Sequence, residues 1–166
     1  MRVAAIDGGY RNLALCIVAN GDICHPTHWQ VFDLWRKKPG RRGVPTRDDL
    51  VRKSVKWCRR HNELLRTCNV IVLENQIREK FIVINCVIQA LFFDTCQVVH
   101  PMTVGAFFQL PVKREQKKQA GVMLVLANNI VFPKSTGKYD DLADAWMMAV
   151  HCLCRCGVVS KNQIKL

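Results

Sequence analysis

The chain has 166 residues, which is enough for one domain with a substantial core and too few for two ordinary domains. Hydrophobic residues make up 49%, which excludes a wholly disordered chain, and no segment approaches the roughly 20 uncharged apolar residues of a membrane span. The formal net charge is +12, from 25 Lys and Arg against 13 Asp and Glu. This excess favours a polyanionic partner, most often nucleic acid.

Three apolar segments with short links open the chain, at residues 2–6, 13–19 and 29–35. A double-glycine turn after Asp7 separates the first two segments, and Asn20-Gly21 is a strong hairpin signal after the second. Consecutive short strands joined in this way predict an antiparallel meander. Residues 36–45 follow as a basic loop rich in Gly and Pro.

Helices and strands alternate in the rest of the chain. Thr46, with Asp49 three residues later, is typical of a helix start, and helical spacing predicts core positions for Leu50, Trp57, Cys58, Leu64 and Leu65. We expect strands at 69–73 and 97–100, and helices at 79–93, 113–129 and 140–154. The helix at 79–93 is expected to be buried nearly all round, and the next to bury Val122, Leu124, Val125 and Leu126. The pattern predicts an α/β fold with helices on a mixed sheet, in one domain at 1–155 followed by a tail at 156–166.

The nine cysteines are an odd number, contain no Cys-x-x-Cys and mostly have apolar neighbours. Free thiols in a reducing compartment explain this usage best. Asp7 also follows the start too closely for the apolar region of a signal peptide, so we expect an intracellular protein. The spacing of His151, Cys152, Cys154 and Cys156 matches no standard zinc module, so we expect thiols on a helix there.

Four acidic residues stand out for their positions in the chain. Asp7 ends the first strand, Glu74 ends the buried strand at 70–73, and Asp141 and Asp144 lie three apart on one helical face. Buried carboxylates cost several kcal/mol unless a cation or hydrogen bonds compensate them. If the four converge, they form an oxygen-rich site suited to Mg²⁺ or Mn²⁺. Two ions about 4 Å apart would serve phosphodiester cleavage, one activating water and the other stabilising the leaving oxygen.

Each acid also has a simpler explanation when taken alone. An Asp before glycines is a common turn former, and acids are favourable at a helix N-terminus, where Asp140 and Asp141 are expected. Asp144 is harder to explain in this way, because Leu142, Ala143, Ala145 and Trp146 flank it. The joint pattern in chain order therefore favours a catalytic site.

That order resembles a known family. Residues 7–14, DGGYRNLA, resemble the Asp-x-Gly-x-x-Asn-hydrophobic-Ala opening of RuvC-like Holliday-junction resolvases, and the likeness is greatest to the branch of poxvirus and fungal mitochondrial enzymes. Residues 74–78, ENQIR, resemble the Glu-x-Gln-x-Arg motif of that branch. Residues 138–145, KYDDLADA, resemble its closing block, with Tyr139 where relatives often have Lys. The resemblance runs from about residue 2 to about residue 153.

The resemblance implies a metal-dependent DNA endonuclease that resolves four-way junctions by paired nicks. It implies an RNase H-like fold, with three antiparallel strands followed by two parallel ones and helices on both faces. A homodimer and two Mg²⁺ or Mn²⁺ ions per site are implied, with Asp7, Glu74, Asp141 and Asp144 as ligands. Asp140 rivals Asp141 as the partner of Asp144. A catalytic lysine is expected within 113–118, where Lys117 is the choice and Lys113 the alternative.

Several further expectations follow from the charge pattern and the family. Basic residues at 36–42 and 113–118 would bind the phosphates of junction arms, although a merely solvated face is the alternative for 36–42. Beyond DNA and a second copy, we expect no membrane partner and no small-molecule cofactor. A viral origin would place the protein in the cytoplasm or at a viral replication site.

Three other functions remain open at the level of the sequence. An RNase H-like nuclease acting on RNA shares the same acids. An actin-like or sugar-kinase ATPase also opens with Asp-x-Gly, but it needs a second glycine-rich phosphate turn that this chain lacks. A binding module without activity would have no use for costly buried carboxylates.

Overall fold

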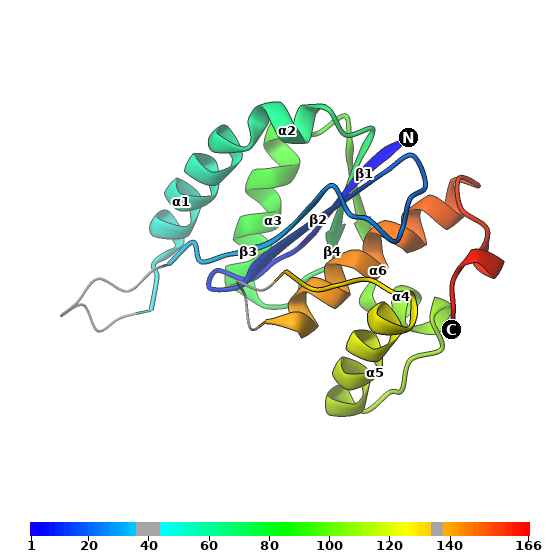
Figure 1. The fold of residues 1–166 in the computed structure, drawn as a ribbon. Coiled ribbons are helices and arrows are strands. Elements are labelled where there is room, and N and C mark those ends of the chain that lie inside the picture. Colours follow the sequence, from blue (N-terminus) through cyan, green and yellow to red (C-terminus); the bar gives the residue numbers. More distant parts are fainter. Residues whose placement is uncertain (36–43, 134–137) are drawn as a thin grey trace.

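The central layer of the protein is a five-stranded sheet, seen in a computed structural model that describes residues 1–35, 44–133 and 138–166 (Figure 1). The strands lie in the order β3-β2-β1-β4-β5. β2 is antiparallel to β1 and β3, whereas β4 is parallel to β1 and β5. The bounds are β1 Arg2–Asp7, β2 Leu13–Ala19, β3 His28–Phe32, β4 Val70–Glu74 and β5 Cys96–Val99. The predicted mixed sheet, three antiparallel strands and then two parallel ones, is confirmed.

Helices cover both faces of this sheet, as predicted (Figure 1). α1 and α3 lie on one face, and α4, α5 and α6 on the other. None of the helices within the described residues is long and apolar enough to cross a membrane. The bounds are α1 Arg47–Arg60, α2 Asn62–Arg66, α3 Glu79–Leu91, α4 Pro101–Phe107, α5 Arg114–Ala127 and α6 Tyr139–Arg155, with a 3₁₀ turn at Lys161–Gln163.

Alternation along the strands divides the core into two halves. In β1, Val3 and Ala5 pack in the cluster that includes α6, whereas Ala4 and Ile6 pack in the cluster under α1 and α3. β4 alternates in the same way. Successive side chains of a strand point to opposite faces, so the parity of a residue determines the helices that it meets.

The start of α1 is the capping box that the sequence predicts. Thr46 Oγ1 accepts a hydrogen bond from the Asp49 backbone N–H, and the Asp49 carboxylate accepts one from the Thr46 backbone N–H. The predicted core positions are buried at Leu50, Trp57, Cys58 and Leu65, and Leu64 is partly buried against them.

The prediction of burial is wrong for α3, and for α5 it is wrong at one position. α3 buries only Ile84, Asn85 and Ile88, and Ile82 is 41% exposed, because the helix packs on one sheet face and α1 and leaves its outer side uncovered. In α5, Leu124 and Val125 are buried and Val122 is partly buried, but Leu126 is 48% exposed.

Two element boundaries also differ from the sequence prediction. The strand predicted at 97–100 is β5, Cys96–Val99, and it is followed by a short helix that was not predicted, α4, which Pro101 opens and the His100 ring caps. β3 ends at Phe32, and the chain then turns, with the Trp35 backbone N–H bonded to the Tyr10 carbonyl. The basic residues at 36–42 lie outside the described residues.

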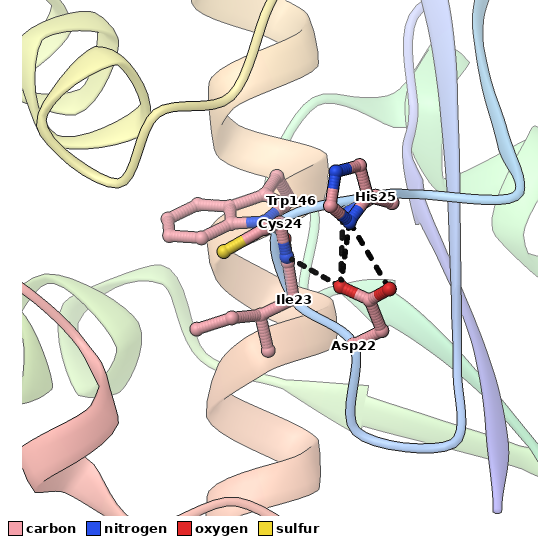
Figure 2. Close-up of polar contacts among 5 residues, drawn as sticks. All are labelled: Asp22, Ile23, Cys24, His25 and Trp146. Carbon is pink, nitrogen blue, oxygen red and sulfur yellow. Dashed lines mark hydrogen bonds and ion pairs between the residues drawn. The ribbon is translucent and has the colours of Figure 1, made fainter.

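The loop after β2 fastens the meander to α6 (Figure 2). Asn20 and Gly21 both have positive φ, 56° and 75°, and form a tight turn after β2, in which the Asp22 backbone N–H bonds to the Ala19 carbonyl. β3 begins only at His28, so the link between the two strands is longer than the two-residue hairpin that this pair predicts. Ile23 is then buried, and its carbonyl accepts a 2.9 Å hydrogen bond from the fully buried Trp146 indole. On the outside, the Asp22 carboxylate contacts the His25 ring at 3.1 Å, and this hydrogen bond lowers the Asp22 pKa.

Residues 156–166 are packed rather than a free tail. Val159 and Ile164 are buried in the cluster around α6. The buried Asn128 side chain at the end of α5 bonds both backbone groups of Lys165 at 3.0 Å. The segment therefore contributes to the core that surrounds α6 and contacts the C-terminal end of α5. The domain boundary at 155 stays a prediction.

Replacing Ile164 by Ala is expected to lower the free energy of unfolding by about 2 kcal/mol, because a buried branched side chain is removed close to the chain terminus. Urea denaturation measures this loss. Leu166→Ala is the matched control, since Leu166 is 56% exposed and should change stability little. Equal stability of the two variants would show that the segment is not part of the core.

Candidate active site

Two of the predicted acids lie at the ends of adjacent parallel strands. β1 and β4 are in register from Val3 beside Val70 to Ile6 beside Leu73, so Asp7 and Glu74 come next at the same edge of the sheet. Both have the parity of Val3 and Val70, which face α6. Strand register therefore places these two carboxylates side by side on the α6 side.

The other two acids lie on α6 where two indoles fix its position. Trp29 donates a 3.1 Å hydrogen bond to the Leu142 carbonyl, and Trp146 donates to the loop at Ile23. These anchors lie on either side of Asp144 in the chain. The sheet and the hairpin loop thus hold the first turns of α6 over the ends of β1 and β4.

One pocket of about 620 Å³ gathers all of these residues. Asp7, Glu74, Asp141 and Asp144 line it, so the structure brings the four predicted acids together. The rest of its wall comes from the turn after β1, the link from β4 to α3, and the N-terminal parts of α4, α5 and α6. Its basic residues are Arg11, Arg78, Arg114, Lys117, Lys118 and Lys138.

Mutual repulsion and burial disfavour the ionised form of the acids. Burial, followed by Glu74 and Asp144, raises the Asp7 pKa well above its ordinary value. Burial and then Glu74 raise the Asp144 pKa to about 7. Burial also raises the Glu74 pKa, against the opposing effect of Lys117. The pocket therefore concentrates negative charge that its own cations compensate only in part.

The structure distinguishes Asp140 from Asp141. Asp140 forms a 2.5 Å ion pair with Lys118, which lowers its pKa although burial opposes the shift. Asp141 Oδ2 is buried and has no hydrogen-bond partner, and burial and Asp140 raise the Asp141 pKa. The uncompensated carboxylate is Asp141, which favours it over Asp140 as the partner of Asp144.

The structure also distinguishes the two candidate lysines. Lys117 lines the pocket, and its charge opposes the rise that burial causes in the pKa of Glu74 and Asp144. Its stem passes close to Gly105 of α4, where a Cβ would lie 3.6 Å from Lys117 Cε. Lys113 is the exposed residue that precedes α5 and does not line the pocket. Geometry therefore favours Lys117 as the basic residue of the site.

A divalent cation fits the donor chemistry of this pocket. No group of three or more His, Cys, Asp or Glu in the described ranges is placed to hold a metal ion as the side chains stand. Burial, followed by repulsion from Glu74 and Asp144, raises the Asp7 pKa, and the buried Asp141 Oδ2 has no hydrogen-bond partner. Carboxylates crowded together with raised pKa values are the ligands whose charge Mg²⁺ or Mn²⁺ would compensate. The residues that would hold it are Asp7, Glu74, Asp141 and Asp144.

Two polar residues support Glu74, and a sequence prediction based on carboxylates does not assign them a role. Gln76 Nε2 donates a 2.7 Å hydrogen bond to Glu74 Oε2. Asn85, on α3, donates a 2.6 Å hydrogen bond to the Glu74 backbone carbonyl. The available signals were the position of Gln76 two residues after Glu74 and the interruption of an apolar helix by Asn85.

The mixed sheet with helices on both faces, and the acidic pocket at the ends of β1 and β4, define an RNase H-like fold similar to that of RuvC. The family model of the poxvirus A22 protein matches residues 1–155. The chain therefore belongs to the poxvirus A22 protein family, and the predicted resemblance to poxvirus resolvases is confirmed. No curated protein matches the chain.

Solved structures similar to this chain include Holliday junction resolvases. The fowlpox virus enzyme has a TM-score of 0.64 and 15% identity, covering 94% of this chain and 99% of its own. The yeast mitochondrial enzyme has a TM-score of 0.65 and 17% identity, covering 89% of this chain and 77% of its own. RuvC of Thermus thermophilus has a TM-score of 0.60 and 18% identity, with coverage of 95% and 98%. A structure of the fowlpox enzyme with Holliday junction DNA is also similar.

Proposed function

We propose that this protein is a metal-dependent endonuclease that resolves four-way DNA junctions by hydrolysing phosphodiester bonds. The observation that carries the proposal is the pocket in which four partly buried acids from β1, β4 and α6 meet beside six basic residues. Membership of the poxvirus A22 protein family and the likeness to resolvases solved with junction DNA support it. An intracellular site of action, the cytoplasm or a viral replication site, is part of the proposal.

The acids and the lysine have separate tasks in this reaction. Two bound Mg²⁺ or Mn²⁺ ions would activate a water molecule and stabilise the leaving 3′-oxygen. Asp7, Glu74, Asp141 and Asp144 would hold the cations, and the charge of Lys117 would offset the charge of the scissile phosphate. The hydrogen bond from Gln76 fixes the orientation of the Glu74 carboxylate.

The cations at the pocket rim suit a phosphate backbone more than a particular base sequence. Arg11 and Arg78 lie on the side of the β1–β2 turn and the β4–α3 link, and Arg114, Lys118 and Lys138 on the side of α5 and α6. A strand passing between the two groups enters the acidic pocket. Phosphate contacts of this kind give affinity that falls steeply with salt, so selectivity comes from the shape of the junction.

A homodimer with its interface along the outer side of α3 would supply the second active site for paired nicks. Ile82 is 41% exposed, Cys86 is exposed on the same helical side, and Phe93 just beyond the helix is 81% exposed. Ile82 and Cys86 are four residues apart and share one side of α3, and Phe93 follows directly after the C-terminal end of the helix. An exposed apolar stripe of this kind indicates a protein–protein interface.

Sedimentation velocity tests this interface. Phe93→Asp should convert a dimer into a monomer, whereas Met123→Asp on the exposed side of α5 should leave it dimeric. A monomeric wild type, or dissociation by the α5 substitution alone, would contradict the assignment to α3.

The substrate proposal is tested with a synthetic four-way junction, a linear duplex and an RNA–DNA hybrid, each with Mg²⁺, Mn²⁺ or EDTA. Symmetric nicks in the junction alone, abolished by EDTA, are expected. Cleavage confined to the hybrid would assign the protein to ribonucleases instead. Equal cleavage of junction and duplex would show that shape does not determine selectivity.

A further inference from the structure

Asn85 is a buried polar residue behind the active-site pocket. It lies on α3, on the sheet face opposite α6, and is 5% exposed. Its Nδ2 donates the 2.6 Å bond to the Glu74 carbonyl, while Oδ1 is buried and has no hydrogen-bond partner. An amide placed in a largely apolar helix with one atom unsatisfied costs free energy, so its place demands an explanation beyond packing.

The same side chain reaches the end of β1. A Cβ on Gly8 would lie 3.0 Å from Asn85 Oδ1 and 3.7 Å from Gln76 Nε2. Gly8 is buried, and its φ is not positive, so a glycine is required there for space rather than for backbone conformation. Gly8 therefore lies close to the side-chain amides of Asn85 and Gln76, each of which donates a hydrogen bond to Glu74.

We propose that Asn85 is a positioning residue that joins the ends of β1 and β4 and thereby sets the separation of the Asp7 and Glu74 carboxylates. This assignment rests on the proposed function, because the two carboxylates are taken as ligands of the catalytic cation. The hydrogen bond to the Glu74 carbonyl fixes the end of β4, and the close approach to Gly8 fixes the turn that follows Asp7. Gln76 completes the arrangement on the pocket side by orienting the Glu74 carboxylate.

The role is distinct from catalysis, because Asn85 does not line the pocket. Residues that orient metal ligands through hydrogen bonds typically change metal affinity or activity by about 10- to 100-fold when they are replaced. The loss of such a residue should therefore appear in cation binding and in kcat. The KM for junction DNA should remain unchanged, because the basic residues that line the pocket are unchanged.

The first test is Asn85→Leu, which keeps a similar volume and removes the donor. Isothermal titration of the DNA-free protein with Mn²⁺ alone should show an affinity about 10-fold weaker than wild type, and kcat on the junction should fall with KM unchanged. Asn128→Leu is the matched control, since Asn128 is also buried and bonds backbone groups far along α5. It should lower Tm and leave Mn²⁺ affinity unchanged. Wild-type Mn²⁺ affinity in Asn85→Leu would overturn the proposal.

The second test asks whether Asn85 affects cation binding through its contact with Gly8. Gly8→Ala should weaken Mn²⁺ binding, because its Cβ meets Asn85 Oδ1, and the double variant with Asn85→Ala should bind no more weakly than Asn85→Ala alone. If the losses of Mn²⁺ affinity from the two substitutions multiply in the double variant, the two residues act independently and the proposed contact is contradicted. Because Mn²⁺ titration uses no DNA, a wild type that binds Mn²⁺ and leaves junctions uncut would refute the proposed function and leave the positioning role standing.

Discussion

Replacing Asp144 by Asn should reduce junction cleavage on the order of 10³-fold, comparable to the loss of one preorganised group that stabilises the transition state. Burial, followed by the charge of Glu74, raises the Asp144 pKa to about 7, so a bound cation would compensate a carboxylate whose charged form the protein disfavours. Junction binding should remain near the wild-type value, since phosphate contacts by Lys and Arg dominate affinity. Single-turnover cleavage of a labelled junction and a mobility-shift titration in EDTA measure the two quantities.

Asp7→Asn and Glu74→Gln should show the same separation of cleavage from binding. Asp140→Asn is the matched control on the same helix, because Asp140 is paired with Lys118. This variant should retain most of the cleavage activity. Normal cleavage by the Asp144 variant would show that the four acids do not form the catalytic site. An inactive Asp140 variant would reassign the cation ligand from Asp141 to Asp140.

Local signals were sufficient to predict most of the fold. The Asn20-Gly21 pair predicts the turn that ends β2, because both residues adopt the positive φ that this pair tolerates, but it does not predict the longer link to β3 at His28. α4 was missed because seven residues after a proline give no helical period, and its stability comes from packing against α6. α3 was predicted to be fully buried because apolar composition does not show which side a neighbouring helix will cover.

The acids of the site were predictable because strand parity and parallel register carry two of them to one edge of the sheet. Their surroundings depend on contacts distant in sequence. Lys118 reaches Asp140 across 22 residues, and Asn85 reaches Glu74 from the opposite face of the sheet. Periodicity contains no information on such pairs, so the choice between Asp140 and Asp141 required the structure.

The burial of charge at Asp144 should make the metal-free protein less stable as pH rises. The folded pKa of about 7 lies above the ordinary value of 3.8, so the folded state binds more protons between these values. The contribution of Asp144 to stability is therefore most favourable below about pH 4, falls as pH rises towards 7, and is least favourable above it. The full difference corresponds to about 4 kcal/mol at most. Asp144→Asn should raise the Tm of the metal-free protein at pH 8 by several degrees and reduce the further rise caused by Mg²⁺.

Asp140→Asn should have the opposite sign under the same conditions. The ion pair with Lys118 lowers the Asp140 pKa, so this carboxylate contributes stability that is present above its ordinary pKa and lost as pH falls through the lowered value. Its removal should lower Tm slightly at pH 8, because the side chain is only partly buried. Thermal melts of wild type and both variants at pH 5 and pH 8, with and without Mg²⁺, measure these differences. A Tm at pH 8 that falls in both variants would show that Asp144 is compensated within the protein and is not held ready for a cation.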